Sequence, residues 1–417
     1  MAIIKAFQGW RYNPEVVGEV KNCLSPLLDA ASSSQLKALY QIETNSIHVS
    51  VPQSQAQAVE KLLAWKRESV LLQDEMPAIY VYFQHFHLPN EEKSYTRRGF
   101  LCMLQIEETE NNKMIGHENT LVSSVNERVH FLEKTGMNFI PTHSLYEDTS
   151  FELEEMMEAY MQTPLLEYED LQQVTHSFAA MTKPEDIAFF QQVLKDKVLY
   201  LADGHHRWES AKAYRKQLQE AGLLAEKDGS NYHFTYLTNL CADDLRILPT
   251  HRIWRPAIDG GIEKWLQNID TYFTITDISG SPTPLYEYLR EKKYAFGLLH
   301  KEYEYVIELR KELNPRLHIS LPFPNEVKEL SYTVLHYFVF EKVGFIPYRR
   351  QPNSPSLRYE KSYSQALREA GKGAYSFICT EVSLPEMIAI CHAGAMMPPK
   401  ATYFYPKVVC GWVFAEI

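Results

Sequence analysis

The chain has 417 residues, a formal net charge of −11 and 45% apolar residues. That length exceeds the roughly 100–200 residues of one typical domain, and the apolar content suffices for a buried core, which excludes a disordered or fibrous chain. The acidic balance argues against a protein that binds nucleic acid through its whole surface, and no uncharged stretch approaches the ~20 residues that cross a bilayer.

The predicted elements alternate between strands and helices. Residues 78–83 (AIYVYF) are rich in aromatic and β-branched types, which favour a strand, and residues 198–202 (VLYLA) form a short apolar run typical of a buried strand. We expect strands at residues 2–7, 78–83, 98–106, 198–202, 234–240, 273–277, 295–299 and 303–309. We expect helices at residues 53–65, 120–135, 184–194, 208–218 and 332–342. The fold class is therefore α+β (mixed α/β), with one boundary near residue 260 that divides residues 1–260 from residues 261–417.

The acidic residues are concentrated in one segment. Nine acidic residues and no Lys or Arg lie between Glu147 and Asp170. We interpret this segment as a solvated acidic face or a domain junction. Because the rest of the chain is nearly balanced, the acidic total does not argue against an anion site elsewhere.

The cysteines predict a reducing compartment. They are widely spread and form no CxxC pair: Cys23, Cys102, Cys241, Cys379, Cys391 and Cys410. We expect reduced thiols and no zinc site built from them. The first residues lack the apolar core and cleavage site of a signal peptide. The sequence thus predicts a cytoplasmic protein without a membrane partner, and it leaves the oligomeric state open.

The clearest local pattern is Asp203-Gly204-His205-His206-Arg207, between the buried strand and a helix. A helix N-terminus attracts anions through its unpaired N–H groups and its dipole. Gly204 lets the backbone approach a ligand, Arg207 can fork onto a phosphate or carboxylate, and the histidines titrate near neutral pH. Asp203 could hold a metal, orient a histidine or cap the helix. The alternative is a capped helix with a surface salt-bridge cluster.

A second cluster lies at His117-Glu118-Asn119-Thr120, at the start of a predicted helix. Glu118 could act as general base toward a substrate hydroxyl, or as a magnesium ligand. The alternative is a cluster that only starts the helix, with Asn119 or Thr120 as its cap. Arg128 lies two turns further along and could point toward the same site.

Two further polar pairs follow predicted strands. Arg11 and Asn13 either contact a ligand or fix the turn before Pro14. His251 and Arg252 form either a second cationic pair at the ligand or a satisfied structural pair.

Two lysines flank an aromatic stretch near the end of the chain. We expect residues 403–405 (YFY) to pack as core or cover. Lys400 and Lys407 could close over phosphates from this side, although long lysines are usually exposed.

The loop at residues 203–207 resembles the phosphate-binding loop of the ParB/sulfiredoxin-like superfamily, in which a related loop cradles nucleotide phosphates. Some members of that superfamily are free-serine kinases, and others act in chromosome partition or sulfinic-acid repair. This resemblance covers only the loop and its flanking elements, and it implies a phosphate-loop region elaborated with additional strands and helices. Common catalytic motifs are absent: the sequence has no GxxxxGK, GxGxxG, GxSxG or HExxH.

A wider resemblance covers nearly the whole chain. Five segments, at residues 7–13, 117–120, 202–207, 248–252 and 397–407, are similar in order and spacing to the domain-of-unknown-function family 1015 of bacterial and archaeal proteins. That family has no established activity. The chain departs from its pattern at residues 25–30, where SPLLDA replaces APPYDV and keeps only Asp29 of the polar residues, and at Ala401, where serine is usual.

The loop and the superfamily resemblance together suggest a nucleotide-dependent phosphotransferase that acts on a small hydroxylated metabolite, with ATP or ADP and Mg²⁺ as cofactors. Two alternatives stay open: a non-catalytic nucleotide- or phosphate-binding regulator, and a phosphatase or nucleotide hydrolase. The expected catalytic residues are Glu118, His117, Asp203 and His206. The residues expected to bind phosphate or cofactor are Gly204, His205, Arg207, Arg11, Asn13, Thr120, Arg128, His251, Arg252, Lys400 and Lys407. We assign no dedicated metal site, and we expect a small-molecule or nucleotide ligand rather than a nucleic acid.

Overall fold

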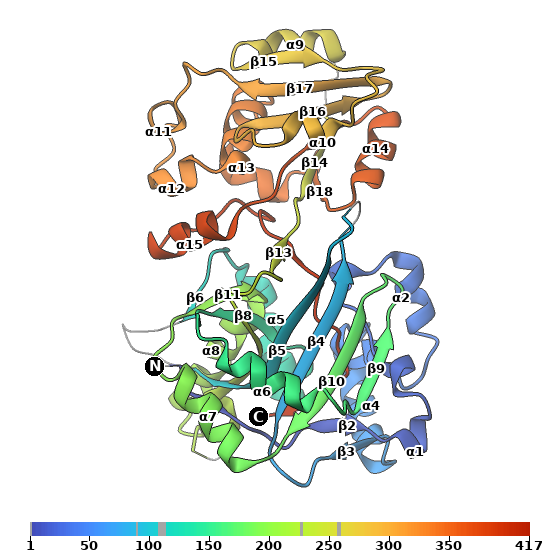
Figure 1. Ribbon diagram of the computed structural model, residues 1–417. Helices are drawn as coiled ribbons and strands as arrows, with labels where there is room; N and C mark the ends of the chain where they lie inside the picture. The colour runs from blue at the N-terminus through green and yellow to red at the C-terminus, as the bar shows by residue number, and fades with distance from the viewer. Residues whose placement is uncertain (1, 89–90, 107–113, 226–227, 257–259) are drawn as a thin grey trace. The chain divides into compact units, whose positions relative to one another are not determined.

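The computed structural model, drawn in Figure 1, describes residues 2–88, 91–106, 114–225, 228–256 and 260–417. The chain forms two compact units. The first contains Met1–Gly116, Thr120–Leu245 and Pro406–Ile417, and the second contains His117–Asn119 and Arg246–Tyr405. The sequence placed its boundary near residue 260, next to residues 257–259, which lie outside the described residues. The units instead change after Leu245, and residues 406–417 return to the first unit.

The first unit is built on a nine-stranded mixed sheet. Its strand order is β6 (Met114–Ile115), β11 (Leu199–Asp203), β8 (Thr142–Tyr146), β12 (Tyr232–Asn239), β5 (Ser94–Gln105), β4 (Ile79–His87), β10 (Thr175–Met181) and β9 (Leu166–Glu169), with β1 (Ile4–Lys5) paired to β5. Neighbouring strands are antiparallel except for β6 with β11 and β8 with β12, which are parallel. Strands β4 and β5 pair antiparallel as a long hairpin, from Tyr80 opposite Leu101 to His87 opposite Ser94.

Both faces of this sheet are buried, because alternate residues of each strand face opposite cores. In β4, Ile79 and Val81 pack into one core, while Tyr80 and Tyr82 pack into the other. The first core is covered by helices α6 (Glu152–Tyr160), α7 (Pro184–Leu194) and α8 (His205–Glu220). The second core lies under residues 408–415 of the C-terminal segment. The aromatic and β-branched composition of β4 suits such a two-sided position.

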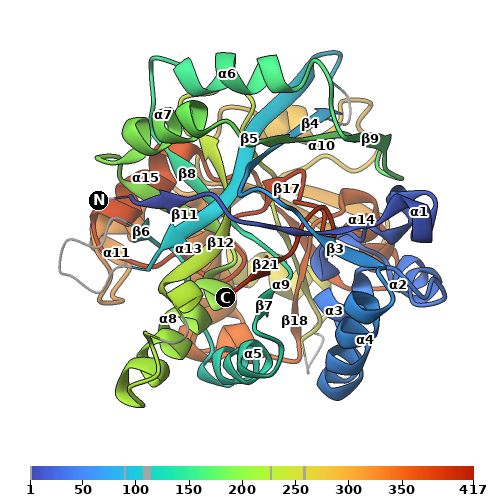
Figure 2. The same ribbon diagram turned by 90° about the horizontal axis from the view of Figure 1, so that it is seen from below.

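The remaining elements of the first unit are short apart from two helices. They are α1 (Pro14–Val17), α2 (Ser33–Leu39), α3 (Ile47–Ser50), α4 (Gln55–Arg67), α5 (Val122–Thr135), and the two-stranded pairs β2 (Trp10–Tyr12) with β3 (Leu71–Gln73) and β7 (Met137–Asn138) with β21 (Ala415–Glu416). Helix α5 packs along α8 through Val129, Leu132, Tyr214 and Leu218, and Figure 2 shows the two helices near each other. This packing brings α5 to the helix that follows the 203–207 loop.

The second unit contains a six-stranded antiparallel sheet. Its order is β15 (Phe273–Asp277), β17 (Tyr303–Leu309), β16 (Ala295–His300), β19 (Tyr375–Ile378), β14 (His251–Trp254) and β18 (Leu357–Glu360), and β13 (Arg246–Ile247) pairs separately with β20 (Phe404–Tyr405). Its helices are α9 (Ile262–Asp270), α10 (Leu285–Leu289), α11 (Pro315–His318), α12 (Asn325–Lys328), α13 (Ser331–Val334), α14 (Tyr363–Gly371) and α15 (Leu384–His392). After α13 the chain continues as a π-helix over Leu335–Val343.

The structure confirms a mixed α/β fold, whereas the ParB/sulfiredoxin-like resemblance stays a prediction. The predicted helix at residues 184–194 and the strands at residues 273–277 and 303–309 have the predicted bounds. The predicted helix at residues 332–342 is confirmed, and most of it has the wider π-helical turn. No helix within the described part of the chain is long and apolar enough to cross a membrane.

The acidic segment is not uniformly solvated, so that interpretation is wrong for two of its residues. Asp148 and Glu154 are buried. Asp148 accepts a hydrogen bond from Lys197 Nζ at 3.1 Å, and Glu154 Oε1 accepts one from Tyr146 at 2.9 Å. These two carboxylates are part of the interior of the first unit.

Candidate functional site

The 203–207 loop joins β11 to α8. Asp203 is the last residue of β11 and lies opposite His143 of β8, and α8 begins at His205. Gly204 takes a positive φ of 93°, a conformation that side chains disfavour. A Cβ atom there would also lie 2.6 Å from Nε and Nη2 of Arg207. Glycine is therefore required both by the backbone turn and by the arginine that folds back over it.

Asp203 is held between two cations. Lys407 Nζ donates to its Oδ1 at 2.9 Å, and Arg207 Nη2 donates to its Oδ2 at 2.8 Å. Burial opposes ionisation, but the charges of Lys407 and Arg207 outweigh it and hold the pKa of Asp203 well below its usual range. The residue before α8 in the capping position is Gly204, and no side chain caps the helix. The alternative that Asp203 caps the helix is therefore wrong.

A third cation lies near the loop. Arg128, on α5, is exposed, but desolvation of its guanidinium and the positive charge of Arg207 lower its pKa to about 10. The Nε of Arg207 is buried and has no hydrogen-bond partner among the described residues. Glu127 also faces Arg128, and both side chains are exposed, so solvent screens their charges. Lys407 and Arg207 thus pair with Asp203, and Arg128 adds an exposed cation next to Arg207.

Of the two loop histidines, His205 is uncharged and His206 accepts a hydrogen bond from the backbone. Burial, with the positive charges of Arg207 and Lys407, lowers the pKa of His205 to about 4, although Asp203 opposes this shift. His206 Nε2 accepts a hydrogen bond from the backbone N–H of Leu121 at 3.0 Å, which ties α8 to the start of α5. His205 is therefore neutral at pH 7, and the catalytic role assigned to His206 stays a prediction.

Both arginines line a small cavity between α5 and α8. Its volume is about 60 Å³, and its polar lining comes from Arg128, Arg207, Ser50, Ser210 and Asn138. Sites for whole drug-sized ligands measure roughly 300–1,000 Å³. This cavity therefore has room for one small group and not for a whole nucleotide.

Arg97 is a residue of this region that the sequence analysis missed. It is fully buried on β5, directly opposite Gln84 of β4. Its Nη2 donates to Gln84 Oε1 and to the carbonyl of Pro406, and Gln84 Nε2 donates to the carbonyl of Lys407 at 2.9 Å. These contacts hold residues 406–407 over the sheet and so position the Lys407 side chain at Asp203. The sequence did contain a signal for its burial. Arg97 and the apolar Leu101 are an even number of residues apart on the same strand, so they face the same side of the sheet.

Arg11 and Asn13, also in the first unit, are engaged locally. Arg11 pairs with Asp74 at 2.6 Å, and Tyr80 donates to the same carboxylate at 2.6 Å. Asn13 caps α1, because its Oδ1 accepts from the backbone N–H of Glu15 at 3.1 Å. The structure does not place a hydrogen bond between either residue and the 203–207 loop.

Thr120 precedes α5, whose capping residue is Leu121 and has no side-chain cap. The interpretation of Asn119 or Thr120 as the cap of this helix is therefore wrong. The helix begins at Val122 rather than at Thr120, so the 117–120 cluster lies before the helix and not on its first turn.

The other predicted residues belong to the second unit. His117 Nε2 lies 3.0 Å from Thr402 Oγ1, and its carbonyl accepts from Met397 N at 2.8 Å. Glu118 is half-buried next to it, and Lys400 is exposed with a left-handed φ of 55°.

Arg252 and His251 lie inside the second unit. Arg252 is fully buried and donates to His336 Nε2 at 3.0 Å, with its guanidinium 4.2 Å from the ring centre of Tyr332 and 4.9 Å from that of Tyr359. His251 Nδ1 accepts from the backbone N–H of Cys379 at 3.3 Å, and burial lowers the pKa of His251 to about 4. These contacts favour the satisfied structural pair over the second cationic pair.

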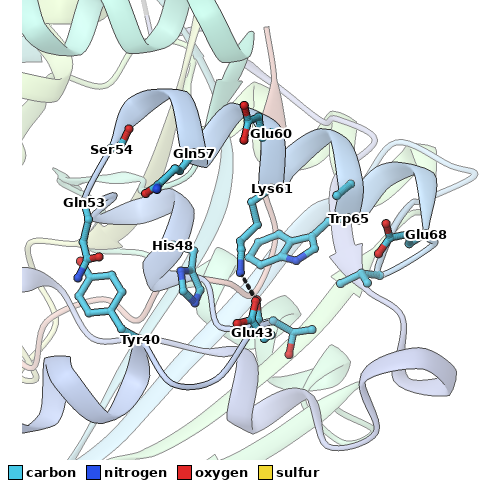
Figure 3. Close-up of a pocket in the computed structure, with 13 residues that line it drawn as sticks. Tyr40, Glu43, His48, Gln53, Ser54, Gln57, Glu60, Lys61, Trp65 and Glu68 are labelled. Atoms are coloured by element: carbon cyan, nitrogen blue, oxygen red, sulfur yellow. Dashed lines mark hydrogen bonds and ion pairs between the residues drawn. The ribbon is translucent and has the colours of Figure 1, made fainter.

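A larger cavity of about 580 Å³ lies at α2–α4, and Figure 3 shows its lining. Lys61 projects toward Glu43 and pairs with it at 2.6 Å, next to the rings of Tyr40, His48 and Trp65. None of the described residues that line it has a buried polar side-chain atom without a partner. The sequence did not predict this cavity, whose one lysine, Lys61, is already paired with Glu43.

Comparison with known proteins gives a family and weak structural likenesses. The family described as "Protein of unknown function (DUF1015)" matches residues 4–333. A search of curated proteins finds no match. Among solved structures, a free serine kinase mutant in complex with ADP matches at a TM-score of 0.35 and 13% identity, over 76% of this chain and 92% of that one.

Two other solved structures give similar values. SbnI with a C-terminal truncation, from Staphylococcus aureus, matches at a TM-score of 0.36 and 13% identity, over 74% of this chain and 84% of that one. A conserved hypothetical protein from Pyrococcus furiosus matches at 0.34 and 13% identity, over 73% and 91%. At these scores the likeness carries no argument about the activity of this chain.

Proposed function

The chain belongs to the DUF1015 family of proteins of unknown function, and we propose that it is a nucleotide-dependent phosphotransferase that acts on a small hydroxylated metabolite. In this proposal the loop Asp203–Arg207 holds phosphate groups. The observation that carries it is the excess of positive charge at the loop, where two cations pair with one carboxylate and Arg128 adds an exposed third.

The charge balance fits a phosphate better than a structural ion-pair cluster. Lys407 and Arg207 both pair with the carboxylate of Asp203, and Arg128 adds an exposed cation beside Arg207, so cations exceed carboxylates in these contacts. Excess positive charge at the largely buried Arg207 is costly unless an anion offsets it. A phosphate dianion would balance this excess and would accept hydrogen bonds from the unpartnered Arg207 Nε.

In this proposal each polar group of the loop has a definite role in phosphate binding. Arg207 and Arg128 bind phosphate oxygens in the small cavity between α5 and α8, and the N–H groups at the start of α8 add to the attraction. Lys407 keeps Asp203 ionised and so holds Arg207 in place. His205 stays neutral and offers one donor or acceptor without adding charge.

The nucleotide would bring its own magnesium. Both oxygens of Asp203 accept hydrogen bonds from cations, so the loop does not offer this carboxylate to a metal. Mg²⁺ is commonly held by substrate phosphates and water with few protein ligands. Glu118, in the second unit, remains the candidate base from the sequence, and its role needs its own variant, Glu118→Gln.

The test combines binding with turnover. The protein is titrated with AMP, ADP, ATP and inorganic phosphate by calorimetry, and then incubated with ATP or ADP, Mg²⁺ and a pool of hydroxylated metabolites while phosphorus NMR follows new phosphate esters. We expect binding that Arg207→Ala weakens by about a hundredfold, which corresponds to about 2.7 kcal/mol. Lys216→Ala, an exposed site on the same helix, is the matched control and should bind normally.

Each result separates the alternatives. New phosphate esters that disappear in Arg207→Ala support the phosphotransferase. Binding without turnover would replace it with a regulator, and release of inorganic phosphate alone would replace it with a hydrolase. Absence of binding to all four probes would end the phosphate-site proposal.

A further inference from the structure

A cavity of about 490 Å³ opens on the first unit, away from the residues assigned to phosphate. It is formed by the outer end of β5, the start of α6 and the turn after β12, and its lining is strongly acidic. Its volume lies within the range of small-molecule sites, roughly 300–1,000 Å³.

Two carboxylates of this cavity have oxygens that nothing satisfies. Glu154 is 7% exposed; its Oε1 accepts from Tyr146, but its Oε2 is buried and has no partner among the described residues. Asp244 is 6% exposed; its Oδ2 accepts from the backbone of Arg98 at 3.4 Å, and its Oδ1 is likewise buried without a partner. Leaving a buried acceptor unpaired is costly, and more so when it is charged. In native structures such an oxygen marks a place that a bound water, ion or ligand can satisfy.

Two of the nearby cations pair with other carboxylates. Arg98 Nε donates to Glu158 at 2.8 Å, and Lys93 Nζ donates to Asp243 at 2.5 Å. Arg97 faces Asp244 through its charge; its Nη2 donates to Gln84 and to the carbonyl of Pro406, and its Nε and Nη1 have no hydrogen-bond partner among the described residues. No hydrogen bond within the described residues reaches Glu154 Oε2 or Asp244 Oδ1.

We propose that this cavity binds an organic amine, whose primary ammonium group donates hydrogen bonds to Glu154 Oε2 and Asp244 Oδ1. An ammonium supplies both the charge and the several N–H donors that the two oxygens lack. Tyr95 and Phe151 add aromatic side chains to the same lining, and Lys93 Nζ lies 5.0 Å from the ring centre of Tyr95. Phe151 also takes a left-handed φ of 58°, a strained conformation that clusters at ligand sites.

A metal ion fits the cavity less well. No group of three or more His, Cys, Asp or Glu in the described ranges is arranged to hold one. The cavity also has far more room than a bare ion fills. The proposal does not depend on the phosphate site, because none of its residues touches the 203–207 loop through a contact described above.

The test uses the full chain and calorimetric titration with 1,4-diaminobutane at neutral pH. Tetramethylammonium serves as a second probe, because it carries the same charge per group but no N–H donor. Glu154→Gln and Asp244→Asn remove one deep charge each, and Glu154→Gln keeps an acceptor for Tyr146. Glu155→Gln lines the same cavity from an exposed position and is the matched control. Arg207→Ala should leave diaminobutane binding unchanged while it weakens phosphate binding by about a hundredfold.

We expect diaminobutane to bind the unaltered protein, each deep variant to lose about tenfold or more in affinity, and the control to lose less than about threefold. Melting of the ligand-free variants gives an independent readout: Glu154→Gln should melt at the same or a higher temperature, whereas removal of a merely structural carboxylate would lower it. Absence of diaminobutane binding, equal affinity in Glu154→Gln, or equally tight tetramethylammonium binding would overturn the proposal. The proposal would also be overturned if the protein bound Mg²⁺ but not diaminobutane, and if Glu154→Gln abolished the Mg²⁺ binding.

Discussion

Lys407 donates a hydrogen bond to Asp203 at 2.9 Å although 204 positions separate them in the sequence. This contact makes the C-terminal segment part of the loop that the local motif appeared to define. Arg97 and Gln84 hold the backbone of residues 406–407 in place, so the lysine arrives at the carboxylate already oriented. The electrostatics of the loop are therefore set by a long-range contact as much as by its own five residues.

Removal of that contact should destabilise the first unit. Lys407→Met leaves Asp203 buried with only Arg207 as an ionic partner, and breaking a buried pair in this way costs about 3–5 kcal/mol. We expect a clearly lower midpoint in urea unfolding followed by circular dichroism. Lys400→Met, at an exposed position on the same stretch, should stay within about 0.5 kcal/mol of the unaltered protein. Equal stability of the two variants would show that the Lys407 pair contributes nothing.

Arg128→Gln should separate binding from stability. Arg128 is exposed and faces the positive charge of Arg207, so its removal should leave the ligand-free protein about equally stable. The same change should weaken ADP binding by about tenfold, or about 1.4 kcal/mol. Thermal shift with and without ADP measures both effects, with Arg67→Gln at an exposed helix end as control. Loss of stability with unchanged ADP affinity would contradict the charge-excess interpretation.

Arg252 should prove structural. Arg252→Lys keeps the charge but loses the planar contacts with Tyr332 and Tyr359 and the hydrogen bond to His336. We expect a loss of about 3 kcal/mol or more in the free energy of unfolding, because the buried partners are left unpaired. ADP affinity should change by less than about twofold. Arg255→Lys, at a partly exposed neighbouring position, is the control, and a variant that folds normally but loses ADP binding would return Arg252 to the ligand site.

The buried histidines should make the protein acid-sensitive. Burial, with the charge of Arg207, lowers the pKa of His233 to about 3, and neither ring nitrogen has a hydrogen-bond partner in the described structure. In the unfolded chain His233 takes up a proton near pH 6.5, whereas in the folded chain it does not do so until about pH 3. The free energy of unfolding therefore keeps its full value above pH ~6.5 and falls by about 1.4 kcal/mol per pH unit as the pH drops toward ~3.

His233→Met removes that proton uptake and one unsatisfied buried group. The variant should therefore be more stable at neutral pH, and its melting temperature should fall less between pH 7 and pH 5. His130→Met, at an exposed position, should follow the unaltered protein. A variant with the same pH profile as the unaltered chain would show that His233 is not the group that titrates.

The sequence predicted local features well and long-range ones poorly, for physical reasons. The aromatic and β-branched composition of residues 78–83 identified β4, and the glycine after the apolar run at residues 198–202 identified the turn into α8. The start of α8 was placed at Trp208 rather than His205, because no side-chain cap marks the boundary. The charge excess at the loop depends on Lys407 and Arg128, which approach Asp203 only through tertiary packing. Burial decided the role of Arg252, and no local pattern distinguishes a buried arginine from an exposed one.

The arrangement of the first unit has a consequence for biosynthesis. Residues 406–417 complete its second core and supply Lys407, but the ribosome makes them only after residues 246–405. During translation, the face of the large sheet that carries Tyr80 and Tyr82 therefore stays uncovered while residues 246–405 are synthesised. Domains that are continuous in the sequence can fold as they emerge, but this one cannot close until residues 406–417 have been synthesised. A nascent chain that stalls inside the second unit would present that apolar face to chaperones.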